Sequence, residues 1–581
     1  MPSFAHLLTA IPQFSFCYPF SSCGAPAISP TPAPYGLEYP NKLGAVASES
    51  DICSTIGIDI LRRGGNAADS LVATQFCIGV VGMYHSGIGG GGFMIVRKPG
   101  ASQNGTEGYE FIDFRETAPA SATEDMYNGN VNGSLYGGLA SGVPGEVRGL
   151  EYLHKNYGKL PWVDVVMPAV KVARYGYRVN ADLVKYMASA TSGVDNFLLN
   201  NPTWALDFAP NGTLLQINDT ITRKRYADTL ETIAVYGPDA FYTGAIARTM
   251  IAALDKENGT MTLEDLQNYT IALRKPAQID YRGYRLTSCS APSSGGIALS
   301  VMKVIEGYHD IGDLSTLNLS THRLDEAIKF GYGARTSFGD PLYVDGLQEY
   351  EDSLLSDAVA KEIRGKISDV QAQNLSYYDP SGIESLETPG TSHVVTADAD
   401  GMAISLTSTV NLLFGSKLMV PETGIIMNNE MNDFSIPNVT NAFGYVPSPA
   451  NFVRPGKRPL SSISPVIVEL PDGTLYFVVG AAGGSRITTS TIQSLWHVLD
   501  RNLTSLEALA QPRLHDQLIP QTTYFEYAYD NSTVAFMKER GHNITYVAPG
   551  LSAVQALRRL PNGTFESAGE PRQKNSGGFA T

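Results

Sequence analysis

The stretch from Gly390 to Asn411 constrains the fold most strongly, because it alternates apolar and polar residues on both sides of the tripeptide Ala-Asp-Gly at 399–401. Such alternation is typical of strands, and a three-residue loop with glycine in the left-handed position joins antiparallel strands. In that register Thr391 lies opposite Thr409, and Asn411 follows on the same face. A slip of one residue would turn these side chains to the other face. The hairpin therefore predicts two neighbouring threonine hydroxyls.

Thr391 is a candidate nucleophile, although a threonine hydroxyl reacts poorly unless a base lies beside it. The α-amine of the threonine itself is one such base, and it exists only if the chain is cut at the Gly390–Thr391 bond. An α-amine has a reference pKa of about 7.7–8.0, so it can accept a proton near neutral pH. Gly-Thr is also a common dipeptide at the start of an ordinary strand. The bond is thus either a cleavage site or an unremarkable link.

A site for a developing negative charge is predicted at Gly483 and Gly484. A second hairpin turns at residues 471–473, and its outgoing strand runs into these glycines just before the helical pattern of residues 487–499. Backbone N–H groups at a helix N-terminus suit an oxyanion. The alternative is a tight turn without any catalytic role.

Charged and hydroxyl groups elsewhere in the chain suit the head group of an α-amino acid. Glu430 and Asp433 can hold an ammonium group, and the planar guanidinium of Arg115 can grip a carboxylate with two hydrogen bonds. Ser461 and Ser462 offer hydroxyls and N–H groups for the same carboxylate. Each of these residues could equally form a surface ion pair or a cap.

Two of the five cysteines are predicted to lie close together. Cys53 and Cys77 lie on two predicted helices joined at Gly64-Gly65, with Asn66 as the N-cap of the second helix. An antiparallel helical hairpin would bring the two cysteines alongside each other, close enough for a disulfide. Two separate buried thiols remain the alternative.

Composition excludes several classes of function. The net charge of −15 argues against a nucleic-acid partner, which requires concentrated Lys and Arg. The cysteine spacing fits no zinc site, the glycine run at 87–92 lacks the Lys-Ser/Thr of a phosphate loop, and the acidic turn at 398–401 lacks the closing glutamate of a calcium loop. We therefore predict no cofactor and no metal.

Compartment is indicated by glycosylation sequons. Thirteen Asn-X-Ser/Thr sites occur among 29 asparagines, which favours a glycoprotein of the secretory pathway that is secreted, at the cell surface or vacuolar. The first 20 residues are a poor signal peptide, because they lack a basic start and prolines interrupt the apolar run. No stretch of about 18 apolar residues occurs.

Prolines and two glycines interrupt residues 1–43, which are predicted to form a leader and linker. From residue 44 onward helical and strand patterns mix without repeats or long hydrophilic linkers. A single large α+β unit is therefore expected rather than several tethered domains.

Several motifs taken together resemble the γ-glutamyltransferase (glutathione hydrolase) family in order and spacing, from about residue 44 to the C-terminus. The later part of the chain resembles its small subunit in GTSHVVTADADG, LTSTVNLLFGS, GIIMNNEMNDFS, PSPANFVRPGKRPLSSISP, GAAGGSRI and PRLHDQ. The earlier part resembles its large subunit in GAVASES, ILRRGGNAADS, GIGGGGFMIV, DFRETAP, GVPGEVRGL and APSSGG.

The resemblance implies an N-terminal-nucleophile hydrolase with a four-layer αββα sandwich. The precursor would cut itself before the threonine of its G-T-S-H motif, giving a large subunit of residues 44–390 and a small catalytic subunit of residues 391–581 that stay together as a heterodimer. The roles that the resemblance implies are a nucleophile and base at Thr391, an orienting hydroxyl at Thr409, an α-amine site at Asn411, Glu430 and Asp433, an α-carboxylate site at Arg115, Ser461 and Ser462, and an oxyanion hole at Gly483 and Gly484. The Cys53–Cys77 pair also matches a disulfide of animal members.

The implied activity is hydrolysis and transfer of the γ-glutamyl group of glutathione and related compounds, to water or to amino-acid or peptide acceptors, through a γ-glutamyl-threonine intermediate. One alternative is a related acylase that removes a dicarboxylic acyl group such as glutaryl from an antibiotic nucleus. A further alternative, from a different class, is a secreted glycoprotein without catalytic activity. We also expect His393, two residues after Thr391, to support the strand rather than act as a base.

Overall fold

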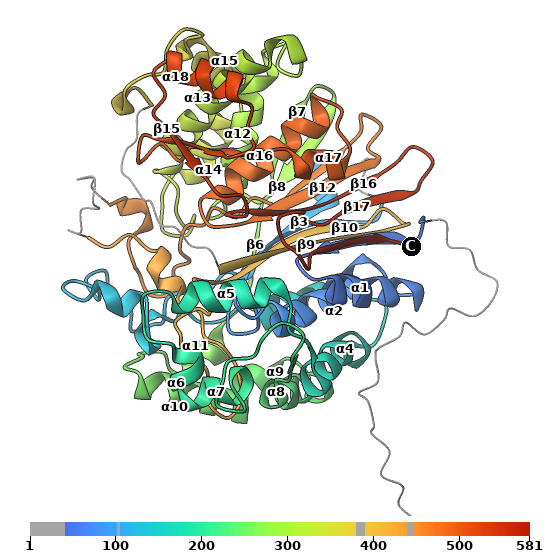
Figure 1. Ribbon diagram of the computed structural model, residues 1–581, viewed down its shortest axis with the longest axis vertical. Helices are drawn as coiled ribbons and strands as arrows, with labels where there is room; N and C mark the ends of the chain where they lie inside the picture. Colours follow the sequence, from blue (N-terminus) through green and yellow to red (C-terminus); the bar gives the residue numbers. More distant parts are fainter. Residues whose placement is uncertain (1–40, 101–104, 379–389, 438–446) are drawn as a thin grey trace, which may run out of the picture. The chain divides into compact units, whose positions relative to one another are not determined.

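Two β-sheets packed face to face form the centre of the protein, with helices on both outer sides (Figure 1). The structure is a computed structural model, and it describes residues 41–100, 105–378, 390–437 and 447–581. The predicted leader and linker, residues 1–43, lies outside the described residues except for its last three positions. The order of layers is helix, sheet, sheet, helix, so the expected mixed α+β fold is confirmed.

The first sheet has seven strands in the order β18-β1-β9-β10-β2-β3-β6. Its central pair is the predicted hairpin. The strands are β1 (Gly44–Ser48), β2 (Gly91–Arg97), β3 (Tyr109–Asp113), β6 (Ala272–Arg274), β9 (Gly390–Asp398), β10 (Ala403–Asn411) and β18 (Gly577–Ala580).

The second sheet has six strands in the order β17-β16-β12-β11-β8-β7. Its hairpin β11–β12 turns at residues 471–473, as predicted. The strands are β7 (Ala277–Tyr281), β8 (Tyr284–Ser288), β11 (Val466–Glu469), β12 (Leu475–Ala482), β16 (Ala553–Arg559) and β17 (Phe565–Ala568). Two small sheets are formed by β13 (Leu514–His515), β14 (Thr523–Glu526) and β15 (Ile544–Val547), and by β4 (Tyr177–Arg178) and β5 (Thr220–Ile221).

Helices cover the outer faces of both sheets in two separate groups (Figure 1). The group against the seven-stranded sheet comprises α1 (Asp51–Arg62), α2 (Ala67–Val81), α3 (Glu146–Tyr157), α4 (Trp162–Tyr175), α5 (Ala181–Thr191), α6 (Phe197–Asn200), α7 (Pro202–Phe208), α8 (Lys224–Tyr236), α9 (Asp239–Thr243), α10 (Ala245–Lys256) and α11 (Leu263–Asn268). The group against the six-stranded sheet comprises α12 (Gly295–Glu306), α13 (Leu317–Arg335), α14 (Leu347–Leu354), α15 (Asp357–Lys366), α16 (Arg486–Leu499), α17 (Ser505–Ala510) and α18 (Asn531–Glu539).

The hairpin of β9 and β10 has the predicted register, with Thr391 opposite Thr409. Every residue of both strands is buried, because one face meets the second sheet and the other meets the helices. The polar residues of the alternating pattern therefore do not face solvent, and their hydroxyls bond to neighbouring layers instead. For example, Thr396 donates to the carbonyl of Ala67 at 2.9 Å and Ser405 donates to that of Val479 at 3.0 Å.

Each of the two large sheets contains strands from both sides of the Gly390–Thr391 bond. Strand β1 lies between β9 and β18, so a strand from the beginning of the chain is enclosed by two from its end. Strand β10 pairs with β2, and β11 pairs with β8. Any two pieces produced by a cut at this bond would share both sheets.

Helices α1 and α2 form the predicted helical hairpin. Asn66 caps α2 by accepting hydrogen bonds from the backbone N–H groups of Ala68 and Asp69. Cys53 and Cys77 form a disulfide with their Cα atoms 5.3 Å apart, which confirms the predicted pairing. Cys289 is a buried free thiol.

The glycine run at 87–92 packs tightly against neighbouring backbone. A Cβ atom on Gly90 would lie 2.0 Å from the carbonyl oxygen of Thr409, and one on Gly92 would lie 2.1 Å from that of Thr407. Only glycine lets strand β2 approach β10 this closely.

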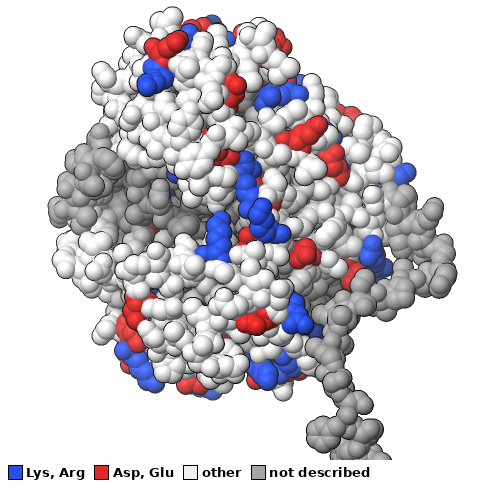
Figure 2. Space-filling model, viewed as in Figure 1, with Lys and Arg blue, Asp and Glu red and all other residues white. Residues whose placement is uncertain are grey.

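On the face that Figure 2 shows, acidic and basic side chains of the described residues are interspersed among uncharged ones. None of the helices in the described part of the chain has the length and apolar character needed to cross a membrane.

Candidate active site

A cleft at the start of β9 gathers residues that are far apart in the chain. Nine of the ten predicted site residues line it, and Gly483 is the exception. The nine are Arg115, Thr391, Thr409, Asn411, Glu430, Asp433, Ser461, Ser462 and Gly484. The cleft lies where the two sheets meet, because β9 and β10 belong to one sheet and Gly484 follows β12 of the other.

Thr409 connects Thr391 to the peptide bond that precedes it. Its Oγ1 lies 3.5 Å from the Oγ1 of Thr391, which can donate to it. The Thr409 hydroxyl itself donates to the carbonyl oxygen of Gly390 at 2.6 Å and accepts a hydrogen bond from the N–H of Asn411 at 2.7 Å. One hydroxyl thus contacts both the candidate nucleophile and the carbonyl group of the predicted cut.

Asn411 reaches the cleft differently from the simple alternation that the sequence suggests. A bulge separates it from Thr409, and its φ angle of 76° lies in the left-handed region that asparagine tolerates. Its Nδ2 donates to the carbonyl of Asn429 at 2.9 Å. Its Oδ1 is buried and accepts no hydrogen bond from the described residues.

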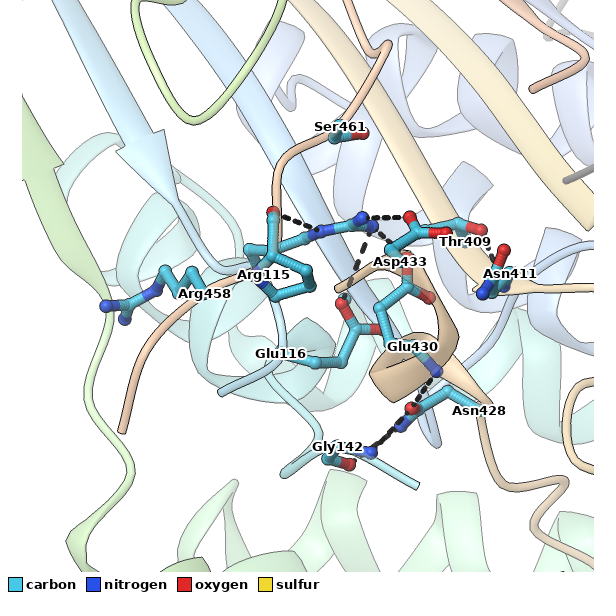
Figure 3. Close-up of polar contacts among 12 residues, drawn as sticks. Arg115, Glu116, Gly142, Thr409, Asn411, Asn428, Glu430, Asp433, Arg458 and Ser461 are labelled. Atoms are coloured by element: carbon cyan, nitrogen blue, oxygen red, sulfur yellow. Dashed lines mark hydrogen bonds and ion pairs between the residues drawn. The ribbon is translucent and has the colours of Figure 1, made fainter. Parts of the chain in front are cut away.

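The guanidinium of Arg115 forms ion pairs with Glu430 and, at 2.5 Å, with Asp433 (Figure 3). Arg115 is only 1% exposed. Burial by itself lowers the pKa of Arg115, but Glu430, Asp433 and Glu116 together outweigh burial and raise it. The arginine therefore carries its charge in the ligand-free cleft.

The predicted carboxylate holder thus pairs with the predicted ammonium holders. A ligand that carries both an ammonium and a carboxylate can replace these ion pairs. Its carboxylate can pair with Arg115 while its ammonium pairs with Glu430 and Asp433. A ligand with only one of the two charges would leave a buried charge without a partner, which is costly.

Two carboxyl groups near Arg115 have raised pKa values and therefore ionise less readily than usual. Burial raises the pKa of Glu116 to about 8, although Arg115 opposes this. Burial also raises the pKa of Glu430 well above its usual range, with Arg115 again opposing and Glu116 and Asp433 adding to the rise. An incoming ammonium group would favour the ionised form of Glu430.

The serine loop offers less than the sequence suggests. The N–H of Ser461 donates to the carbonyl of Pro292 at 2.9 Å, so it is not directed at a ligand. The Oγ of Ser461 accepts from the N–H of Ile463 at 3.2 Å, and its carbonyl accepts from the Ser294 hydroxyl at 2.6 Å. The hydroxyls of Ser461 and Ser462 and the N–H of Ser462 remain the groups of these two serines that can donate to a carboxylate.

Gly483 and Gly484 lie between β12 and α16, as predicted from the sequence. Both have positive φ angles, 124° and 60°. A Cβ atom on Gly483 would lie 2.5 Å from the carbonyl oxygen of Leu551. Of the two, Gly484 lines the cleft.

Two asparagines that the sequence did not single out hold the site together. Asn428 donates to the carbonyls of Gly89 and Gly142 at 2.8 Å each, and its Oδ1 accepts from the N–H groups of Gly142 and Glu430 at 2.9 Å each (Figure 3). Asn451 donates to the carbonyl of Asp433 at 2.7 Å and accepts from the N–H of Leu460 at 2.9 Å. A single sequence gives no sign of such bonds, because both asparagines bond to backbone groups that lie far away in the chain or across a loop.

His393 supports the strand, as predicted. Its Nδ1 lies 2.8 Å from the Oγ1 of Thr407 and its Nε2 lies 3.2 Å from the Oγ of Ser405. Burial lowers its pKa to about 3. The ring is therefore neutral at ordinary pH and fills the space above Gly480, where a Cβ atom would lie 2.2 Å from it.

One group of side chains has the composition of a metal site. His322, Glu326 and His542 are buried and offer ligand atoms within 4.8 Å of one another. The ammonium of Lys329 lies 2.9 Å from the Nδ1 of His542 and 3.2 Å from both Glu326 and Asp325. A lysine thus already supplies the positive charge at this position. The structure leaves the prediction that no metal binds untested.

Comparison with known proteins gives a consistent result over nearly the whole chain. The sequence model of the family described as gamma-glutamyltranspeptidase matches residues 53–580. A glutathione hydrolase proenzyme of Arthroderma benhamiae is 56% identical over 94% of both chains. A glutathione hydrolase of Aspergillus flavus is 52% identical over 94% of this chain and 90% of the relative.

Solved structures agree with the sequence comparisons. A cephalosporin acylase from Bacillus halodurans matches with a TM-score of 0.79 and 28% identity, covering 96% of this chain and 99% of its own. A gamma-glutamyltranspeptidase from Helicobacter pylori matches with a TM-score of 0.50 and 33% identity, covering 55% of this chain and 90% of its own. On this evidence, the chain belongs to the γ-glutamyltranspeptidase family.

Proposed function

We propose that this protein is a precursor that cuts itself at the Gly390–Thr391 bond, and that the mature enzyme hydrolyses and transfers the γ-glutamyl group of glutathione and related compounds. Membership of the family supports the activity. The names of its relatives, glutathione hydrolase and glutathione hydrolase proenzyme, support the substrate and the processing.

The observation that carries the substrate assignment is a set of acceptor groups in the cleft without hydrogen-bond donors. Arg115 pairs with one oxygen of Glu430 and one of Asp433, whereas the other oxygen of each carboxylate (Glu430 Oε2 and Asp433 Oδ1) and Asn411 Oδ1 are buried and accept no well-aligned hydrogen bond from the described residues. An ammonium group has three donors and no acceptor. The α-amine of a γ-glutamyl substrate would supply the donors that these oxygens lack.

The opposite end of the head group is assigned to Arg115 with the hydroxyls of Ser461 and Ser462. When the substrate binds, its α-carboxylate replaces Glu430 and Asp433 as the partner of Arg115. Its α-amine replaces Arg115 as the partner of the two carboxylates. This exchange favours α-amino acids over simple carboxylic acids or amines.

The contacts of Thr409 support a route for the cut. The Thr391 hydroxyl attacks the carbonyl carbon of Gly390, while the Thr409 hydroxyl, 2.6 Å from the carbonyl oxygen, stabilises the negative charge that develops there. As the C–N bond breaks, the hydroxyl proton passes to the leaving nitrogen and an ester forms between Gly390 and the Thr391 oxygen. Water then hydrolyses this ester, which leaves a carboxylate on Gly390 and restores the Thr391 hydroxyl. The freed α-amine of Thr391 then serves as the base.

Turnover follows from the same groups. Thr391 Oγ1 attacks the γ-carbonyl of the substrate, the α-amine accepts the proton and returns it to the leaving amine, and the Gly484 region holds the oxyanion with Gly483. The γ-glutamyl ester at Thr391 is then released by water or by the amine of an acceptor.

The proposed subunits are residues 44–390 and 391–581, in an N-terminal-nucleophile hydrolase with an αββα sandwich. The strand pairs β1–β9, β10–β2 and β11–β8 each join one proposed subunit to the other, which supports a lasting heterodimer.

The test is release of the chromogenic amine from a γ-glutamyl anilide by the wild type and by Thr391→Ala. We expect two polypeptides on a denaturing gel for the wild type, with Thr391 as the new N-terminus, and one inactive polypeptide for the variant. A wild-type chain that stays whole after incubation would contradict the proposal.

The cephalosporin acylase similarity favours a second candidate, removal of a glutaryl-type group. Such a substrate has no α-amine, so it does not need Asp433. The substitution Asp433→Ala should abolish γ-glutamyl turnover and spare glutaryl turnover if the protein is an acylase. This candidate would be excluded if Asp433→Ala lost all turnover and the wild type did not turn over a glutaryl substrate.

We also propose that the protein enters the secretory pathway and is glycosylated. Eleven of its thirteen sequons lie in described residues, and ten of these asparagines are exposed. An endoglycosidase should therefore shift the mass of the secreted protein, and an unchanged mass would contradict the proposal.

A further inference from the structure

A second arginine faces the cleft and has no assigned role. Arg335 is the last residue of α13, is partly exposed and lines the same cleft as Thr391 and Arg115. It also lines a recess that continues from the cleft and shares Tyr332, Arg335, Leu460 and Gln517 with it.

The position of the Arg335 guanidinium is fixed at one end. Its Nε donates to the hydroxyl of Ser294 at 2.9 Å, and that hydroxyl donates to the carbonyl of Ser461 at 2.6 Å. The arginine is thus tied to the loop that carries the serines of the candidate carboxylate site. Among the described residues, its two terminal nitrogens have neither a hydrogen-bond acceptor nor a carboxylate partner.

This differs from the state of Arg115, whose terminal nitrogens pair with Glu430 and Asp433. Of the described residues that line the recess, none is acidic and Arg335 is the one cation. Leu460, Leu518 and Ile519 give the recess an apolar wall. A group that binds there should be an anion on a small apolar or neutral body.

We propose that Arg335 forms a second carboxylate site, which binds the C-terminal carboxylate of the peptide on the leaving side of the γ-glutamyl bond. The ligand class is a γ-glutamyl peptide with a free C-terminus, as opposed to a γ-glutamyl amine or anilide. The peptide lies along the cleft towards the mouth of the recess, and the two terminal nitrogens of Arg335 grip its carboxylate with two parallel hydrogen bonds.

This inference rests on the proposed function, because it places the rest of the substrate in a cleft whose inner end holds the γ-glutamyl head group. A dipeptide leaving group places its carboxylate roughly 7 Å beyond the scissile carbonyl when it is extended. That separates the carboxylate from Arg115, so the two arginines bind different ends of one substrate.

The experiment compares three substrates: γ-glutamyl-cysteinyl-glycine, the same tripeptide with a C-terminal amide, and a γ-glutamyl anilide. Glutamate release is measured for the mature wild type and for Arg335→Gln, Arg335→Lys and Arg248→Gln. Arg248 is an exposed arginine of α10 outside the cleft, so it serves as the matched control.

For Arg335→Gln we expect kcat/KM for the free acid to fall about tenfold, chiefly through KM, because a charged hydrogen bond is lost. The amide and the anilide should change less than twofold. Arg335→Lys should recover part of the loss on the free acid, and Arg248→Gln should match the wild type on all three substrates.

An equal loss on all three substrates would show that Arg335 only holds the Ser461 loop in place, and it would overturn the proposal. An unchanged preference of Arg335→Gln for the acid over the amide would overturn it as well. A wild type that turns over none of the three substrates would instead contradict the proposed function, and this inference would fall with it.

Discussion

The hydroxyl of Thr409 lies 2.6 Å from the carbonyl oxygen of Gly390 and donates a hydrogen bond to it. The same oxygen atom of Thr409 lies 3.5 Å from the hydroxyl of Thr391. The register of a single hairpin therefore puts one hydroxyl in contact with both partners of the proposed cut.

Removing the Thr409 hydroxyl should slow maturation. Thr409→Val keeps the shape of the side chain but removes the donor to Gly390, so we expect the cut to slow about a hundredfold. The measurement is the fraction of cleaved chain over time on a denaturing gel. Thr409→Ser keeps the hydroxyl and should cleave at a rate close to that of the wild type. Equal rates for Thr409→Val and the wild type would show that the hydroxyl does not assist the cut.

Asn428 should matter for substrate affinity although it does not line the cleft. Asn428→Asp removes both donors to Gly89 and Gly142 and adds a buried negative charge beside Glu430. We expect a loss of about 3 kcal/mol in the free energy of unfolding and a KM for the γ-glutamyl anilide raised at least about tenfold.

Thermal unfolding and steady-state kinetics check both parts of the Asn428 prediction. Asn130→Asp, an exposed substitution at a side chain that caps no helix, is the control and should change neither quantity. A destabilised Asn428→Asp protein with an unchanged KM would restrict the role of Asn428 to folding.

Buried neutral histidines should make the protein sensitive to acid. Burial lowers the pKa of His393 and of His515 to about 3 and that of His322 to about 4. In the unfolded chain each protonates near the reference pKa of about 6.5. Because the folded pKa is lower, the stability that each histidine contributes is present above pH 6.5 and is lost as the pH falls towards the folded pKa, by about 1.4 kcal/mol per pH unit.

His393→Gln should therefore show a smaller decrease in melting temperature between about pH 6.5 and 4 than the wild type. Glutamine can keep a hydrogen bond to Thr407 and does not titrate. Parallel curves of melting temperature against pH for the two proteins would mean that His393 is not held in its neutral form in the folded protein.

The mature subunits should separate only on unfolding. Strand β1 lies between β9 and β18, so neither proposed subunit can leave without breaking the seven-stranded sheet. The cleaved protein should run in native size analysis at the mass of the uncut chain, 62.5 kDa before glycosylation, and both fragments should melt in one transition. Release of either fragment without denaturant would contradict this sheet order.

Local features were predictable wherever a short stretch of sequence contains the cause. Gly401 in the turn sets the register of Thr391 and Thr409, and Gly64-Gly65 sets the hairpin that joins Cys53 and Cys77. In both cases the two partners lie within 25 residues of each other, so local geometry is enough. The bulge that turns Asn411 was not predictable, because it depends on the contacts of a finished sheet.

The charged groups of the site were predictable one by one but not as a pair. Residue type and family resemblance selected Arg115, Glu430 and Asp433 for opposite ends of a ligand. Their pairing in the ligand-free cleft joins residues more than 300 positions apart, and it follows from burial of all three in one place. Asn428 and Arg335 had no sequence signal, because an amide in a loop or an arginine at the end of a helix is usually on the surface.

By itself the sequence determined the hairpin, the candidate nucleophile and the family, because turn chemistry and motif order are written in neighbouring residues. The tertiary structure alone decided which distant charges meet, which acceptors stay without donors and which strands of the two proposed subunits interleave. The physical reason is that these depend on burial, since a charge or an acceptor acquires its chemistry from the groups packed around it and not from its neighbours in the chain.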